Sequence, residues 1–311
     1  MSVTVWLPAY TKISLKLSSS AVTPFYKQNT NSSILKCSPQ LQLQLQLGFN
    51  PSQRDIFTRC YCKMKERETP FSSPLRQEDD SPWESGGVWS NLALYLFTLH
   101  IPLSFGGLSV VALLTGRQPL HPQTQALSLL TIQVLEFNAA LVLLKYTAKP
   151  QYKFSNFFKN NKLLSDRNWY LSSALGFGFL VLLVCLSSLV ADRLFGFEAV
   201  SNPTLKEILL NSDISRVSCV VAYCIVTPLL EEVVYRGFLL TSLSSTMKWQ
   251  KAIAISSVIF SAIHFSGGNF VQLFIIGCVL GCSYCWTGNL KSSIVIHSLY
   301  NALTLIITYF Y

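Results

Sequence analysis

Residues 215–240 read SRVSCVVAYCIVTPLLEEVVYRGFLL, an apolar stretch of spanning length that nevertheless holds three ionisable side chains. A membrane-spanning helix needs about 20 apolar residues, and a charge at bilayer depth costs about 2.5–3.5 kcal/mol on insertion scales. Glu231, Glu232 and Arg236 must therefore pair with one another or line a hydrated cavity. Glu232 and Arg236 are four residues apart and share a helix face, which predicts an ion pair. Glu231 is turned about 100° from Glu232, so it points toward the bundle interior.

The rest of the chain repeats the apolar pattern. Half of the 311 residues are apolar and only 13% are charged, whereas a soluble protein carries about a quarter charged residues. Stretches near spanning length occur at about residues 89–114, 126–144, 169–191, 215–240, 250–267, 270–287 and 291–310. The sequence therefore predicts an all-α fold, a polytopic membrane helix bundle of about seven transmembrane helices.

The basic residues are placed as membrane topology requires. A net charge of +9 could suit nucleic acid, but the Lys and Arg side chains gather in the N-terminal region and in short loops. If the N-terminus lies on the inner side of the membrane, the basic loops at 145–167, 248–251 and 291 all lie on that same side. The positive-inside rule places loops rich in Lys and Arg there. We therefore expect a lipid bilayer as a partner and no nucleic acid.

The N-terminal region has the composition of an organellar leader. Residues 1–54 contain no Asp or Glu, and they are rich in Ser, Thr, Asn and Gln with scattered Lys. Such a segment resembles a transit peptide and lacks the apolar core of a secretory signal. We predict a transit peptide over 1–62, a polar linker over 63–87, N-terminal membrane helices with a basic loop over 88–168, and a second membrane-helical domain over 169–311. More Ser and Lys than Arg favours a chloroplast membrane, thylakoid or inner envelope, over the mitochondrial inner membrane.

Two histidines lie inside later spans. His264 ends the segment FSAIH in the fifth span, and His297 lies in the last span with Asn301 four residues on, on the same helix face. At 1.5 Å per residue, Glu231, His264 and His297 lie at depths of about 14, 20 and 10 Å from the basic face. Since these depths are compatible, the three residues can meet in one site.

The motifs resemble those of a known family. EEVVYRG (231–237), FSAIH (260–264) and IHSLYN (296–301) are similar to the EExxxR, FxxxH and HxxxN motifs of the CAAX prenyl endopeptidase and bacteriocin-processing family, and the resemblance covers about residues 169–311. It implies an intramembrane endopeptidase acting on a membrane-associated protein or peptide. By position, Glu231 with His264 would activate water. His297 and Asn301 would stabilise the oxyanion, and Glu232 and Arg236 would orient Glu231.

Three alternatives remain open from the sequence. Zinc could bind at Glu231, His264 and His297, but the HExxH signature is absent, which favours a mechanism without a cofactor. The same fold could serve as a catalytically silent membrane scaffold or chaperone that stabilises partner proteins. A transporter is less favoured, because no inverted repeat is evident.

The other polar groups in the spans can be interpreted without a catalytic role. Gln133 and Glu136 either face the cavity or form a helix–helix hydrogen bond, and His100 is interpreted as structural. The spacing CxxxCxxC at 278–285 resembles a cluster-binding motif. On a spanning helix, however, these cysteines are expected to act as packing residues.

Overall fold

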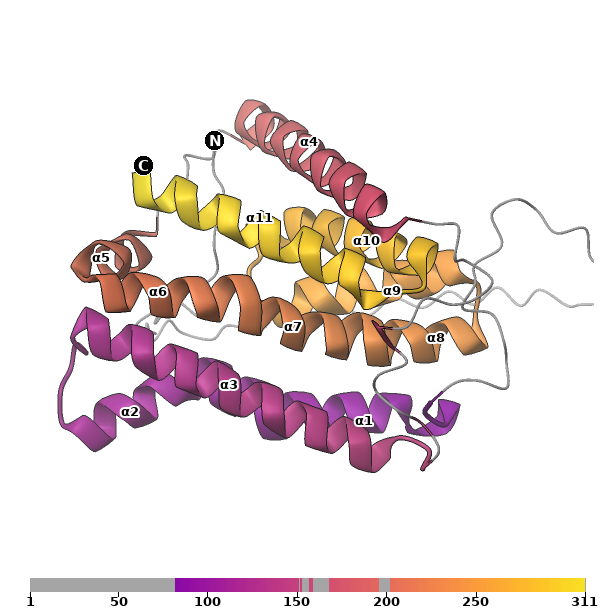
Figure 1. Cartoon of the computed structure of the whole chain (residues 1–311), viewed down its shortest axis with the longest axis horizontal. Coiled ribbons are helices and arrows are strands. Elements are labelled where there is room, and N and C mark those ends of the chain that lie inside the picture. Colours follow the sequence, from indigo (N-terminus) through magenta and orange to yellow (C-terminus); the bar gives the residue numbers. More distant parts are fainter. Residues whose placement is uncertain (1–81, 151, 153–156, 159–167, 196–201, 311) are drawn as a thin grey trace, which may run out of the picture. The chain divides into compact units, whose positions relative to one another are not determined.

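The computed structural model describes residues 82–150, 152, 157–158, 168–195 and 202–310. Within these ranges the regular elements are helices and no strand occurs (Figure 1). In chain order they are η1 (Ser85–Gly87), α1 (Val88–Tyr95), η2 (Leu96–Gly106), α2 (Gly107–Thr115), α3 (Pro122–Thr147), α4 (Trp169–Phe195), α5 (Pro203–Asn211), α6 (Asp213–Val221), η5 (Ala222–Val226), α7 (Thr227–Glu232), η6 (Val233–Leu240), α8 (Thr241–Thr246), α9 (Trp249–Ile263), α10 (Phe270–Thr287) and α11 (Leu290–Phe310). This architecture confirms the prediction of an all-α membrane bundle.

Six helical stretches of the described chain are long and apolar enough to cross a membrane. They are Val88–Thr115, Pro122–Thr147, Trp169–Val190, Asp213–Thr246, Phe270–Thr287 and Leu290–Phe310. The remaining predicted span, 250–267, is the shorter helix α9 of 15 residues. At 1.5 Å per residue α9 measures about 22 Å, less than the roughly 30 Å of a hydrocarbon core. The described part of the chain thus has six full-length candidate spans and one short apolar helix.

The helix that carries the charged residues is continuous but not uniform. From Asp213 to Thr246 it alternates between α-helical segments and two π-helical segments, η5 and η6. Segment η5 ends immediately before Thr227 and Pro228, at the start of α7. A proline inside a helix lacks an N–H and clashes with the preceding turn, and a widened π turn relieves that clash.

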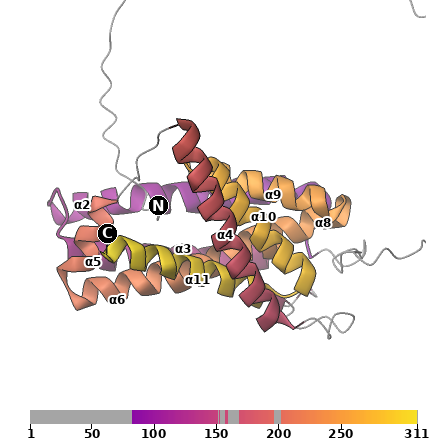
Figure 2. The ribbon, with the colours of Figure 1, turned by 90° about the horizontal axis from the view of Figure 1, so that it is seen from above.

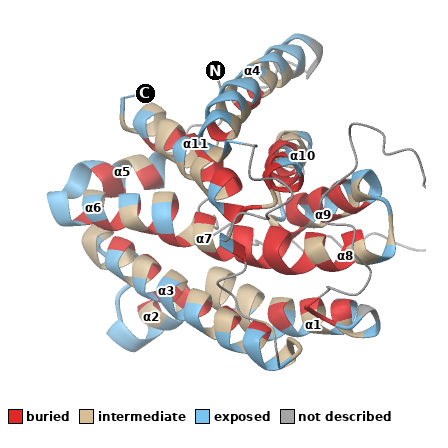
Figure 3. Cartoon of the chain, turned by 45° about the vertical axis from the view of Figure 1, so that its right-hand side comes forward, coloured by how far each residue is buried: buried red, intermediate tan, exposed pale blue. Residues whose placement is uncertain are grey.

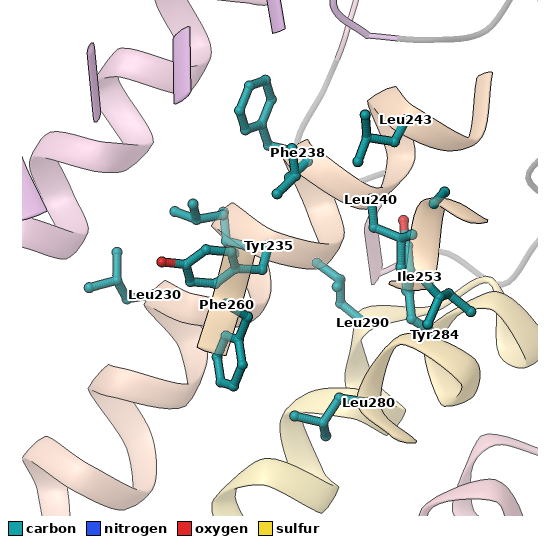
Figure 4. Packing of buried hydrophobic residues seen from close by; sticks show 14 of the residues in the cluster. Leu230, Tyr235, Phe238, Leu240, Leu243, Ile253, Phe260, Leu280, Tyr284 and Leu290 are labelled. Carbon is teal, nitrogen blue, oxygen red and sulfur yellow. The ribbon is translucent and has the colours of Figure 1, made fainter. Parts of the chain in front are cut away.

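The same helix is the most enclosed of the candidate spans. In an apolar stretch of 18 residues within this helix, 56% is buried inside the protein, whereas the same fraction is 17% for the first span and 17% for α4. Figure 3 shows the buried residues concentrated on α7, α8, α9 and α10. In Figure 4 the side chains of Tyr235, Phe238 and Leu240 project from this helix into the packed core. The charged residues therefore lie on an element surrounded by other helices.

The neighbouring helices close around this central element. Helices α9 and α10 form an antiparallel pair, α10 and α11 both pack on α4, and α3 packs along α6. Figure 2 shows α4 crossing over α10 and α11. A Cβ on Gly277 of α10 would lie 2.9 Å from Cβ of Ser257 on α9. Only glycine therefore permits this close approach of the two helices.

The predicted leader (1–62) and residues 63–81 of the predicted linker lie outside the described residues. At the end of that linker, however, Trp83 is only 1% exposed. Its indole ring meets Phe238 edge-on with centroids 4.9 Å apart, and it stacks on Phe157 at 6.2 Å. Burial of an aromatic side chain is strongly favourable, so the end of the linker packs into the core instead of staying solvated.

Candidate active site

Arg236 and Glu232 form the predicted ion pair. Arg236 Nη1 lies 2.8 Å from Glu232 Oε1, and the two side chains are 1% and 0% exposed. The guanidinium also donates from Nη2 to the carbonyl of Gly277 at 3.3 Å and lies over the ring of Phe260, 4.7 Å from its centroid. A buried charge without partners would be very costly, and here the arginine has an acid, a carbonyl and an aromatic face as partners.

Glu232 also holds His297. The Nδ1–H of His297 donates to Oε1 of Glu232 at 2.9 Å, and His297 is 4% exposed. A carboxylate bonded to one ring nitrogen fixes the orientation of the imidazole and directs the other nitrogen elsewhere. The side chain that Glu232 orients is therefore His297, whereas the resemblance implied that Glu232 orients Glu231.

His264 is oriented by its own helix. Its Nδ1–H donates to the carbonyl of Phe260, one turn back, at 2.6 Å. Since a carbonyl oxygen only accepts, Nε2 is the acceptor nitrogen of the neutral ring. Helix α9 ends at this residue, because Phe265 adopts a left-handed backbone with φ 51° and a turn leads into α10.

Glu231 lies between the two imidazoles. Its Oε1 is 3.8 Å from Nε2 of His264, and its Oε2 is 3.7 Å from Nε2 of His297. The carboxyl side chain is 12% exposed. These separations exceed the range of about 2.7–3.2 Å for a direct N–H···O bond, and they suit a water molecule shared between the groups. A carboxylate and two imidazoles on one water are the components of general acid–base chemistry.

Asn301 reaches the same region through the π-helical segment. In η5 the N–H of Thr227 donates to the carbonyl of Ala222, five residues earlier. With the same spacing, an N–H on residue 228 would donate to the carbonyl of Tyr223. Residue 228 is proline and has no N–H. Instead, Nδ2 of Asn301 donates to the Tyr223 carbonyl at 2.8 Å. Asn301 therefore closes a gap in the helix and still lines the pocket.

A pocket joins these residues. Of the predicted site residues, Glu231, His264, His297 and Asn301 line it, while Glu232 and Arg236 lie behind it. The rest of the wall consists of uncharged side chains: Tyr223, Thr227, Phe260, Asn269, Gln272, Leu273, Ile276, Tyr300 and Thr304. Gln272 Nε2 donates to the Tyr300 hydroxyl at 3.0 Å. Apart from Glu231 and the two imidazoles, the residues that line this pocket are therefore uncharged.

Metal binding has no further support from the geometry. In the described part of the chain, no group of three or more His, Cys, Asp or Glu side chains has an arrangement that could hold a metal ion. Cys278, Cys282 and Cys285 are free cysteines on α10.

The two polar residues left open on the second span form helix–helix hydrogen bonds. Gln133 Oε1 accepts from the hydroxyl of Thr227 at 3.3 Å. Glu136 is 0% exposed and accepts hydrogen bonds from the first span. One of its donors is His100, which sequence reasoning treated as structural. The signal that could have identified this pair is the presence of an acid and a histidine in consecutive spans.

Comparisons with known proteins agree with the motifs. Residues 213–303 match a family model described as type II CAAX prenyl endopeptidase Rce1-like. The membrane-embedded CAAX protease MroQ of Staphylococcus aureus (strain USA300) is 30% identical over 139 residues, which cover 42% of this chain and 55% of that protein. The chain thus matches about half the length of this relative. No solved structure matches the chain significantly.

Proposed function

We propose that this protein hydrolyses a peptide bond of a membrane-associated protein within the bilayer. The match of residues 213–303 to the CAAX prenyl endopeptidase family model supports this proposal. The observation that carries the proposal is the position of Glu231, with one carboxylate oxygen turned to each of two imidazoles inside a pocket. An acid at membrane depth is energetically costly, and such residues usually mark functional sites.

Glu231 acts as the general base. It takes a proton from a water molecule whose oxygen attacks the carbonyl carbon of the scissile bond, and His264 Nε2 holds that water from the other side. The tetrahedral intermediate then collapses, the C–N bond breaks, and the proton passes from Glu231 to the leaving amine. Positioned acid–base groups of this kind contribute about 10²–10⁴-fold to a rate.

His297 and Asn301 stabilise the developing oxyanion. With its Nδ1–H held by Glu232, His297 directs Nε2 into the pocket, where an Nε2–H would donate to the oxyanion. Asn301 uses Nδ2 on the Tyr223 carbonyl, and the second hydrogen of the amide is available to the pocket. A fixed donor at an oxyanion is worth about 2.7–4 kcal/mol. Glu232 and Arg236 act indirectly, because they hold His297 in place.

We assign the protein to a plastid membrane, with residues 1–62 as its transit peptide and 63–81 as part of a linker. The composition of residues 1–54 supports this address. The substrate class is a neutral peptide segment of a membrane-associated protein, because the pocket wall around Glu231 is uncharged.

The test is cleavage by the purified protein in detergent. Wild type, Glu231→Ala and His264→Ala are incubated with fluorogenic peptides, prenylated and not, with and without a chelator. We expect cleavage by the wild type, loss in both variants and no effect of the chelator. Sensitivity to the chelator would assign the chemistry to zinc at Glu231, His264 and His297. A wild type that cuts nothing, together with variants that still rescue a knockout, would replace the protease with a scaffold.

A further inference from the structure

A second carboxylate–imidazole pair is buried in the spans that precede the matched domain. Glu136 on α3 is 0% exposed. Its Oε1 accepts from Nδ1–H of His100 at 2.8 Å and from the hydroxyl of Tyr95 at 2.9 Å, and its Oε2 accepts from the hydroxyl of Ser104 at 2.7 Å. A carboxylate with three donors is well stabilised despite its burial.

The π-helical segment η2 brings the three donors together. Tyr95 and His100 are five residues apart, and His100 and Ser104 are four apart. A π-helix has its hydrogen bonds at i→i+5, so such residues share one face, and π segments occur frequently at functional sites. The first span therefore presents one polar face to α3 at this depth.

The pair is built like the Glu232–His297 pair of the site. In both pairs a carboxylate Oε1 takes the Nδ1–H of the histidine, at 2.8 Å for His100 and 2.9 Å for His297. In both, Nε2 is therefore the nitrogen left for another partner. Within the described ranges Nε2 of His100 has no hydrogen bond, and the side chain is 14% exposed.

The cluster lies next to the catalytic pocket. Gln133, one turn before Glu136 on α3, accepts a hydrogen bond from the pocket residue Thr227. The elements that carry His100 and His264 meet through aromatic rings, because Phe105 lies edge-on to His100 at 6.0 Å and edge-on to Phe265 at 5.2 Å.

Phe265 follows His264 directly and has the left-handed backbone that ends α9. A bulky residue in that conformation is strained and needs surrounding contacts to hold it. The Phe105 ring is such a contact. The first span therefore supports the turn on which the orientation of His264 depends.

We propose that Glu136 and His100 are positioning residues of the catalytic centre, which hold His264 in place through the ring contacts from His100 to Phe105 and from Phe105 to Phe265. The centre then extends over the first two spans, outside the segment 213–303 that matches the family model. The proposal rests on the proposed endopeptidase function for its activity readout, and it has a second readout that does not depend on activity.

The decisive variant is His100→Asn. The asparagine amide places an N–H where Nδ1 stands, so Glu136 keeps its donor while Nε2 and the ring are lost. Glu136→Gln, which removes the charge at constant size, is the second variant. Asn138→Ala is the matched control, because Asn138 lies on α3 two residues from Glu136, is exposed and bonds only its own helix.

The purified full-length variants are compared in peptide cleavage and in the reaction of His264 with diethylpyrocarbonate, followed by mass spectrometry. We expect His100→Asn to melt at the wild-type temperature and to keep its KM, with kcat lowered about tenfold because a small misplacement of a catalytic group is costly. We also expect its His264 to react severalfold faster. Asn138→Ala should match the wild type in both readouts.

Unchanged kcat and unchanged His264 reactivity in His100→Asn would overturn the proposal, whether or not Glu136→Gln folds. A wild type that cleaves no peptide would overturn the endopeptidase function instead. In that case the reactivity of His264 alone decides: a change in His100→Asn supports the positioning role, and no change rejects it.

Discussion

At the scale of single residues, the site depends on how one buried glutamate is shared. Glu232 Oε1 receives both Arg236 Nη1 and His297 Nδ1. Each partner satisfies part of the charge that burial would otherwise make prohibitive. Glu231 and its neighbour Glu232 both lie beside His297 but at different ring nitrogens, so the two adjacent acids hold different positions around one imidazole.

Arg236→Ala should be strongly destabilising. It leaves Glu232 buried with His297 as its remaining ionic partner, and breaking a buried pair costs about 3–5 kcal/mol. Thermal unfolding in detergent measures the effect. The matched control is Arg216→Ala, which breaks an exposed pair with Asp213, 42% and 91% exposed, and should cost about 1 kcal/mol or less. Equal losses of stability in both variants would show that the buried Arg236–Glu232 pair contributes no more than the exposed pair.

His297 variants can separate orientation from chemistry. His297→Asn keeps a donor for Glu232 but has no Nε2, so we expect normal stability with a rate lowered about 10²-fold or more. Cleavage kinetics and the melting temperature are measured on the same preparation. A variant with normal cleavage would remove His297 from the reaction.

At the scale of elements, hydropathy predicted the spans because a bilayer leaves few alternatives to helices. Helix α5 was missed, although Asn202 at its N-cap and Pro203 after it are helix-start signals. The π-helical segment η5 was not predictable from apolar periodicity, since it depends on Pro228 and on the tertiary partner Asn301. The short α9 was not predicted either, because its end depends on the conformation of Phe265.

Close packing of α9 and α10 should be sensitive to one methyl group. Gly277→Ala places a Cβ 2.9 Å from Ser257 Cβ and 3.1 Å from Ser257 Cα, and overpacking of this kind costs about 1–3 kcal/mol. It also disturbs the carbonyl that Arg236 binds, so activity should fall as well. Gly178→Ala on α4 meets nothing within 4 Å and should be neutral in both assays. If Gly277→Ala has the same melting temperature and cleavage rate as Gly178→Ala, α9 and α10 have room for a methyl group between Gly277 and Ser257, which contradicts the close packing.

At the scale of the whole molecule, the sequence predicted that Glu231, His264 and His297 could meet, because motif order and depth constrain which side chains can come together, and the three line one pocket. It did not predict the hydrogen bond between Glu136 and His100, because these two residues belong to no family motif. A hydrogen bond between two spans, such as the one from Ser104 to Glu136, produces no repeating pattern in a single sequence and so cannot be predicted from it.

The N-terminal region should direct import. A fluorescent protein fused to residues 1–62 is expected to enter plastids, because this segment combines basic and hydroxyl residues with few acids. A fusion to residues 63–87 serves as the control and should stay in the cytosol. Microscopy with a plastid marker measures both, and accumulation of the first fusion in mitochondria would reverse the assignment.

The central claim is that Glu231 is the base of a hydrolytic site, and a matched series of glutamate-to-glutamine variants tests it most directly. The turnover rate of purified wild type, Glu231→Gln and the exposed control Glu207→Gln is measured on one cleavable peptide, with melting temperatures alongside. The account predicts that Glu231→Gln melts like the wild type and cleaves about 10²-fold or more slowly, while Glu207→Gln is unchanged. A folded Glu231→Gln that cleaves at the wild-type rate would contradict it.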